Sequence, residues 1–274
     1  MTRTRLRTGA TVVMAFVLCG LLLFPLYWMV NVSLTKPRDL ARVPPHLFPV
    51  DPTFDGYRLA LDKNLGSLST SLLIGLGTVV LTLLIALPAA YGMSKLRAPG
   101  TGAVLFMFLL AQMIPSVVLV TALFALYKQL GLLTSYAGLM LANSTASVPF
   151  AIILLQAFMR TIPDEILESA RIDGAGRIRT FLSIVLPLSR NAVVTAALFA
   201  FLFAWGDFLN ARTLTTGNEI VPITLALFRF VGAEVTNWNA VMASAVLASI
   251  PGAFLLVFAQ RYVAAGVTTG AVKD

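Results

Sequence analysis

Six long apolar stretches constrain what this chain can fold into more than any other feature of its sequence. A helix needs about 20 predominantly apolar residues to cross the hydrocarbon core of a membrane. Pro115 and Pro149 interrupt two of the stretches, which a helix bundle tolerates because neighbouring helices satisfy the freed carbonyls. The sequence predicts an all-α integral membrane protein, a single domain over residues 1–274 with six transmembrane helices at 11–33, 69–93, 103–127, 137–159, 191–210 and 239–260.

The composition excludes most other classes of protein. Apolar residues make up 58% of the 274 and charged residues only 12%, and the mean hydropathy is +0.87. Soluble domains carry about a quarter charged residues, so a water-soluble enzyme or a disordered chain is excluded. A single cysteine, Cys19, cannot form a disulfide framework, and a single histidine, His46, cannot build a zinc cluster.

The distribution of charge predicts how the chain is oriented. With the N-terminus in the cytoplasm, the inner segments hold 12 of the 20 Lys and Arg residues, and most of the net charge of +8 falls on that side. Positive charge is enriched in cytoplasmic loops, so we expect a multi-pass protein with both termini in the cytoplasm. The charge therefore reports orientation against membrane lipids, and no nucleic-acid partner is expected. The first apolar run is too long for a typical signal sequence and is interpreted as an uncleaved span.

Two sizeable segments are expected on the outer side. Residues 35–68 contain four prolines between 44 and 52 and are predicted to be irregular. Residues 211–238 contain a moderately apolar stretch, 220–231, that favours a short surface helix with Pro222 in its first turn. Tyr91 and Trp238 are interpreted as side chains that anchor spans at the membrane interface, in preference to platforms on which a sugar stacks.

The largest inner segment, residues 160–190, carries nine of the 32 charged residues. Local physics predicts a helix that begins near Pro163, with Asp164 and Glu165 in its first turn, where the helix dipole favours anions. The helix should end at Asp173-Gly174, because glycine adopts the left-handed conformation that closes a helix. Such an element projecting from the membrane has the shape of a docking surface, although the charge pattern alone favours a solvated connecting loop.

The same segment resembles the EAA loop of ABC importer permeases. The match comprises Glu168, Ala170, Gly174 and, after a gap of nine residues, Ile184-x-Leu186-Pro187. Ser169 stands at the middle position of the EAA triplet. Asp173, Ala175 and Phe181 extend the resemblance to the carbohydrate-uptake branch, and more closely to its MalG-type inner-membrane subunit.

This resemblance implies a fold like that of type I ABC importer permeases, and a set of partners. They are a second six-span permease, two ATP-binding subunits and an extracytoplasmic solute-binding protein or lipoprotein in a bacterial cell membrane. This chain would bind no cofactor, because ATP and Mg would lie on the partner ATPase. The solute would be a di- or oligosaccharide; glycerol-3-phosphate or another polyol is the near alternative. The residues implied in ATPase coupling are Asp164, Glu165, Ile166, Leu167, Glu168, Ala170, Arg171, Asp173, Gly174 and Ala175.

Catalytic motifs are absent from the sequence. No glycine is followed by lysine, so the chain has no P-loop, and it has no GxSxG or HExxH motif. A six-span channel or secondary transporter fits the hydropathy, but neither explains the EAA spacing. Asp207 is the only acid well inside an apolar stretch, and it is interpreted either as functional or as a capped residue at the interface. Together with it, a polar translocation pathway would include Gln112, Asn143, Ser144 and Asn210, although interhelical hydrogen bonds also explain such residues.

Overall fold

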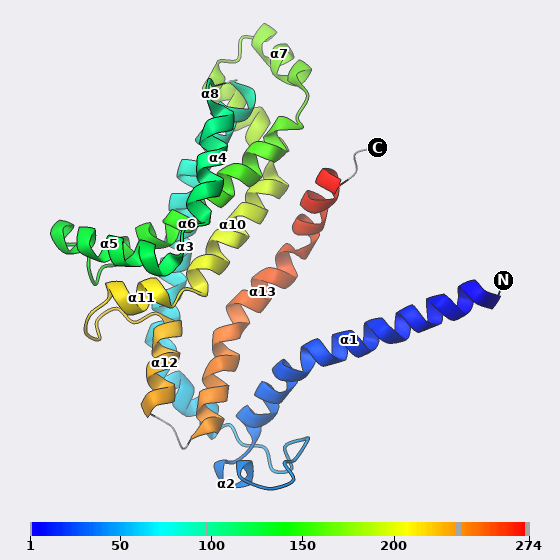
Figure 1. Cartoon of the computed structure of the whole chain (residues 1–274), viewed down its shortest axis with the longest axis vertical. Coiled ribbons are helices and arrows are strands. Elements are labelled where there is room, and N and C mark those ends of the chain that lie inside the picture. The colour runs from blue at the N-terminus through cyan, green and yellow to red at the C-terminus, as the bar shows by residue number, and fades with distance from the viewer. Residues whose placement is uncertain (1, 97, 234–236, 272–274) are drawn as a thin grey trace. The chain divides into compact units, whose positions relative to one another are not determined.

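The computed structural model describes residues 2–96, 98–233 and 237–271, and the other residues of the predicted domain lie outside this range. Every regular element in the described part is helical, as the composition predicted (Figure 1). The elements are α1 (Thr2–Leu34), α2 (Pro37–Leu40), α3 (Asp55–Lys95), α4 (Thr101–Gln112), α5 (Ser116–Leu130), α6 (Tyr136–Arg160), α7 (Asp164–Ile172), α8 (Arg177–Thr180), the π-helical turn η1 (Phe181–Val185), α9 (Leu186–Leu188), α10 (Arg190–Trp205), α11 (Leu209–Leu214), α12 (Ile223–Ala233) and α13 (Trp238–Ala271).

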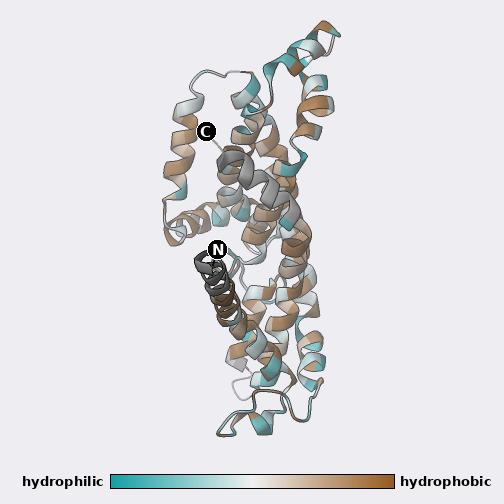
Figure 2. Cartoon of the chain, turned by 90° about the vertical axis from the view of Figure 1, so that its right-hand side faces the viewer, coloured by the Kyte–Doolittle hydropathy of each residue, from teal (hydrophilic) through white to brown (hydrophobic). Residues whose placement is uncertain are grey.

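The described helices account for all six apolar stretches. Four are long and apolar enough to cross a membrane unaided: Thr11–Leu34, Asp55–Lys95, Tyr136–Arg160 and Trp238–Gln260. Two further candidates are bent pairs of helices, so the total is six if each pair forms one span. Hydrophobic residues predominate along the long helices, whereas the helix at the top of the view mixes hydrophilic and hydrophobic residues (Figure 2). The chain is an all-α membrane protein.

The third stretch is not one continuous helix. Residues 103–127 fall in α4 and α5, which meet at an angle of 96°. Pro115 sits at the N-cap of α5, and the amides of Met113 and Ile114 bond to carbonyls only three residues back. Because proline has no amide hydrogen and clashes with the preceding turn, the helix ends before it. The other interrupting proline, Pro149, lies inside α6, which continues through it.

Two other boundaries differ from the sequence expectation. Residues 55–68, expected within an irregular loop, already belong to α3, because no proline follows Pro52 until Pro88 and nothing stops the helix. The helix expected over 191–210 ends at Trp205, with Gly206 at its C-cap. The short helix predicted within 220–231 is confirmed as α12, and Pro222 directly precedes it.

The described chain contains two compact units. The first comprises residues 1–65 and 227–250. Its α1 ends against Asn239, whose amide donates to the carbonyls of Ser33 and Thr35 at 2.8 Å each and so satisfies groups that a helix end leaves unpaired. Asn239 also lies close to Gly56 at the start of α3. Only glycine fits there, because a Cβ at this position would lie 2.0 Å from the Asn239 Oδ1.

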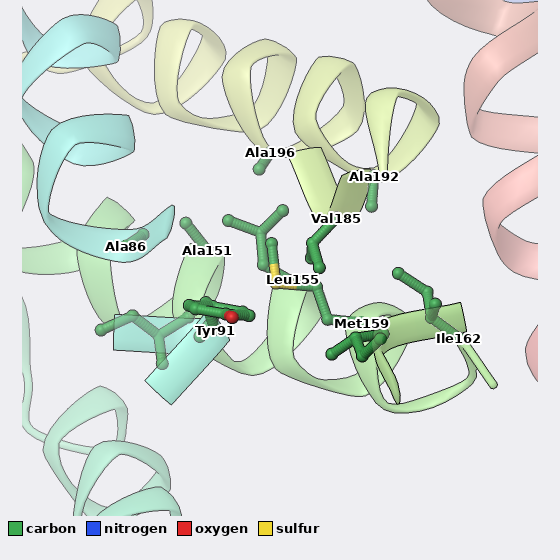
Figure 3. Packing of buried hydrophobic residues seen from close by; sticks show 12 residues of the cluster. Ala86, Tyr91, Ala151, Leu155, Met159, Ile162, Val185, Ala192 and Ala196 are labelled. Carbon is green, nitrogen blue, oxygen red and sulfur yellow. The ribbon is translucent and has the colours of Figure 1, made fainter. Parts of the chain in front are cut away.

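The second unit comprises residues 66–226 and 251–274, and its main core joins α3, α6, η1 and α10. Alanines at positions 86, 151, 192 and 196 let these backbones approach closely around Leu155, Met159 and Val185, and the side chains point toward one another (Figure 3). Tyr91 lies inside this core with 7% of its surface exposed. The expectation that Tyr91 is an interfacial anchor is therefore wrong: its ring packs against Phe181, and its hydroxyl donates to the Arg177 carbonyl.

Candidate functional site: the α7 element and a polar cluster

The N-terminal end of α7 begins where the sequence predicts. Pro163 occupies the N-cap position, and Asp164 and Glu165 form the first turn. Their carboxylates lie at the positive end of the helix dipole, which stabilises them by about 0.3–1 kcal/mol each at an exposed site. The expected acidic first turn is therefore present in the structure.

The C-terminal end of α7 closes with a Schellman motif. Gly174 has a φ of +78°, its amide donates to the Arg171 carbonyl, and the Ala175 amide donates to the Ala170 carbonyl at 2.9 Å. This pattern satisfies the last carbonyls of a helix and requires a left-handed residue, which glycine adopts without a Cβ clash. The predicted end at Asp173-Gly174 is confirmed.

One face of α7 is held by the core of the second unit. Leu167 is 3% exposed and Ala170 is 6% exposed, and Leu167 packs in the same cluster as Met159 and Ile162. Lys95, at the end of α3, has a side chain only 3% exposed; its ammonium donates to the Ile162 carbonyl and to Asp164 Oδ1. Burying a leucine contributes about 1.5–3 kcal/mol, so α7 is fixed firmly to the helices beneath it.

The other face of α7 is exposed and charged. Glu165, Glu168 and Arg171 are all exposed, as are Ile166 at 39% and Ile172 at 87%. A cavity of about 290 Å³ lies beside this helix, lined by Lys95, Leu96, Asp164, Leu167, Glu168, Arg171 and Arg177. The arrangement offers carboxylates, guanidinium groups and apolar side chains together, which suits a protein partner and not a reacting small molecule.

The apolar residues of α7 are divided between two faces of the helix. Leu167 and Ala170 face the chain's own core, and Ile166 and Ile172 remain exposed. In the sequence Lys95 is one of the positive charges of the inner segments, whereas in the structure it clamps the start of α7. Nothing in the sequence links Lys95 to Asp164, 69 residues further on, so only the fold identifies this contact.

Three of the five residues expected in a translocation pathway come together. Asn210 on α11 donates from its amide to Asn143 Oδ1 on α6 at 3.0 Å. The two carboxylate oxygens of Asp207 accept from the backbone amides of Asn210 and Ala211, so Asp207 caps α11. The Thr224 hydroxyl donates to the Asp207 backbone carbonyl and adds a fourth member that the sequence gave no reason to select. We call Asn143, Asp207, Asn210 and Thr224 the polar cluster.

The other two expected pathway residues have different surroundings. Ser144 is 5% exposed, and its hydroxyl bonds to the Met140 carbonyl one turn back in its own helix. Gln112 is exposed and ends α4, directly before the bend at Pro115. Within the residues that the structure describes, no group of three His, Cys, Asp or Glu side chains is placed to hold a metal ion.

The chain matches a known protein family and several named transport proteins. Residues 82–269 match the family described as "Binding-protein-dependent transport system inner membrane component". The "Trehalose transport system permease protein SugB" of Mycobacterium tuberculosis is 35% identical over 93% of each chain. The "Diacetylchitobiose uptake system permease protein DasC" of Streptomyces coelicolor is 32% identical over 92% of each.

A solved structure has the same fold. It is a bacterial ABC transporter involved in the import of the acidic polysaccharide alginate, and its matching chain is 23% identical, with a TM-score of 0.83 over 96% of this chain and 98% of that chain. The family match over residues 82–269 includes both α7 and the polar cluster. The chain belongs to the family of inner-membrane components of binding-protein-dependent transport systems.

Proposed function

We propose that this chain is the permease subunit of an ATP-driven importer and forms half of the translocation pathway for a di- or oligosaccharide. Family membership makes it a transport component and not an enzyme. Relatives named for trehalose, diacetylchitobiose and maltodextrin transport support a sugar over a polyol. They also support an importer over a channel or a secondary transporter.

The partners follow from this assignment. An extracytoplasmic binding protein delivers the sugar, a second six-span permease completes the pathway, and two ATP-binding subunits hold ATP and Mg. A similar fold, with a TM-score of 0.65 and 17% identity, occurs in a bacterial alginate ABC transporter in complex with a periplasmic protein bound to an alginate pentasaccharide. Both termini then lie in the cytoplasm, on the same side as α7, as the positive-charge distribution favours.

The observation that carries the proposal is that α7 has one buried face and one exposed, charged face. Its buried face, with Leu167 and the clamp from Lys95, joins it to the spans, and its exposed face presents Glu168 and Arg171. A helix fixed in this way moves together with the core to which it is attached. Closure of the ATP-binding subunits on ATP would push on the exposed face and turn the spans toward an outward-open state.

The pathway itself is assigned to polar residues of the second unit. The polar cluster, Ser144 and Gln112 supply hydroxyl and amide groups in an otherwise apolar bundle. Sugar hydroxyls exchange hydrogen bonds with such groups, and the bend between α4 and α5 leaves Gln112 exposed for this purpose.

Charge reversal at Glu168 tests the coupling role. In Glu168→Lys we expect the complex to assemble and hydrolyse ATP while sugar uptake falls at least tenfold, because the side chain is exposed and its loss leaves the core intact. Gly174→Val should have the same effect through the backbone, because valine is strained at a φ of +78°. The measurements are ATPase activity and labelled-sugar uptake in proteoliposomes.

The control is Glu219→Lys, the same charge change at another exposed acid outside α7. It should leave uptake and hydrolysis unchanged. Wild-type uptake in both Glu168→Lys and Gly174→Val would contradict the proposed docking of α7.

A further inference from the structure

The first unit contains a cavity that neither the coupling nor the polar cluster uses. It has a volume of about 250 Å³ and lies among the end of α1, α2, the segment after α2 and the start of α13. Trp28 and Trp238 both line it, with Asn31, Thr35, Asp39 and His46 as the polar members. Binding pockets for drug-sized ligands measure about 300–1,000 Å³, so this cavity suits one small ring.

Contacts across the unit hold the walls in place. The ammonium of Lys36 pairs with Asp51, and this contact lowers the pKa of the Asp51 carboxyl. The Tyr27 hydroxyl donates to the Leu47 carbonyl, and the Asn31 amide donates to the His46 carbonyl at 3.1 Å. Asn239, the next residue after Trp238, bonds to the end of α1 and so fixes Trp238 relative to Trp28. The segment of residues 36–53 is therefore tied at both ends and in its middle.

Asn31 does not offer its side-chain oxygen to the cavity. Asn31 is 4% exposed, and its Oδ1 is buried with almost no accessible surface. The polar side chains in the lining that remain for a ligand are those of Thr35, Asp39 and His46.

We propose that this cavity is a subsite for one pyranose unit of the transported saccharide. The inference rests on the proposed sugar-import function and adds a binding site at the first outer segment. A pyranose has an apolar C–H face, which packs on an aromatic ring, and a rim of hydroxyls, which donate to carboxylate oxygens. Trp28 and Trp238 supply the rings, and the Asp39 carboxylate supplies an acceptor.

Fluorine NMR provides a direct test, because the chain has only three tryptophans. The complex purified through a tag on this chain would be labelled with 5-fluorotryptophan, and each resonance would be assigned from Trp28→Phe, Trp205→Phe and Trp238→Phe. Trehalose and maltose, which are both neutral sugars, are the probes. We expect the neutral sugars to shift the Trp28 and Trp238 resonances and to leave that of Trp205, a core residue of the second unit, unchanged.

Substitutions separate the subsite from a general effect on folding. Trp238→Ala should weaken the neutral-sugar response at Trp28 at least tenfold, whereas Trp238→Phe keeps an aromatic platform and should retain it. Phe48→Ala is the matched control, because Phe48 is an aromatic residue in the same segment, 70% exposed and outside the cavity lining.

The outcomes distinguish this inference from the proposed function. If the wild-type complex takes up trehalose or maltose while neither resonance responds at millimolar sugar, the subsite is wrong and the importer stands. An equal response in Trp238→Ala and the wild type would also overturn the subsite. If the resonances respond as expected but no sugar is transported, the subsite stands and the proposed import function fails.

Discussion

The α7 element and the polar cluster both contain several polar side chains, but in α7 the charged side chains face outward, whereas in the polar cluster the polar side chains bond within the chain. In α7, the residues that face inward are Leu167, Ala170 and the clamping Lys95, and the charges of Glu168 and Arg171 point outward. In the polar cluster, Asp207, Asn210 and Asn143 bond to one another or to nearby backbone. Both regions belong to the second unit, so the contrast does not come from different parts of the fold.

The difference shows how to interpret polar residues in a chain with few of them. A polar side chain whose hydrogen bonds are satisfied inside the bundle stabilises the bundle, because leaving such a group unpaired in an apolar interior is costly. An exposed charge on an element that is already anchored contributes little to stability and is available to another protein. The first kind should respond to substitution through unfolding, and the second through loss of coupling.

The largest expected effect is at the buried face of α7. Leu167→Ala removes a side chain that is 3% exposed, and such core truncations cost about 2–5 kcal/mol. We expect a lower unfolding temperature of the purified complex and a fall in uptake. Ile172→Ala on the same helix is the control: the side chain is 87% exposed, so the stability should change by less than about 0.5 kcal/mol. Equal stability of the two variants would mean that α7 is not anchored through Leu167.

The clamp at the start of α7 should give an intermediate effect. Lys95→Met keeps most of the apolar stem but removes the donor to Ile162 and Asp164, and hydrogen bonds to charged groups contribute about 1.5–3 kcal/mol. We expect reduced stability and, because the start of α7 is released, less sugar transported per ATP hydrolysed. Lys128→Met, at an exposed lysine in the last turn of α5, should change neither quantity. If the two variants behave alike, Lys95 does not hold α7.

The sequence predicted those features that depend on local chemistry. Pro163, the acidic turn and Gly174 gave the bounds of α7 to within a residue or two, because each acts on its own backbone. The apolar stretches likewise located the helices. The family resemblance pointed to α7 as the coupling element, and its role in coupling stays a prediction.

Features that depend on distant contacts were not predictable. The burial of Leu167, the clamp from Lys95 and the placement of Tyr91 in the core all require knowing which helices are neighbours. A similar limit applies to Pro115 and Pro149, which look alike in the sequence but respectively end a helix and lie inside one. For Asp207, the sequence left function and capping as equal alternatives, and the structure shows the cap.

The smallest expected effect distinguishes these two interpretations of Asp207. Asp207→Asn keeps the shape of the side chain but leaves one acceptor oxygen for two backbone amides. The free energy of unfolding should therefore fall by about 0.5–1 kcal/mol, which is at the lower end of the range for a lost helix cap. The matched control is Ser135→Ala, which removes the hydroxyl that caps α6 by accepting from the Gly138 amide at 3.0 Å. If Asp207 serves only as a cap, both variants lower the unfolding temperature slightly and leave the KM for sugar uptake unchanged. A raised KM in Asp207→Asn alone would mean that the carboxylate contacts the sugar. The polar cluster would then resemble the exposed face of α7, because both would bind a molecule outside this chain.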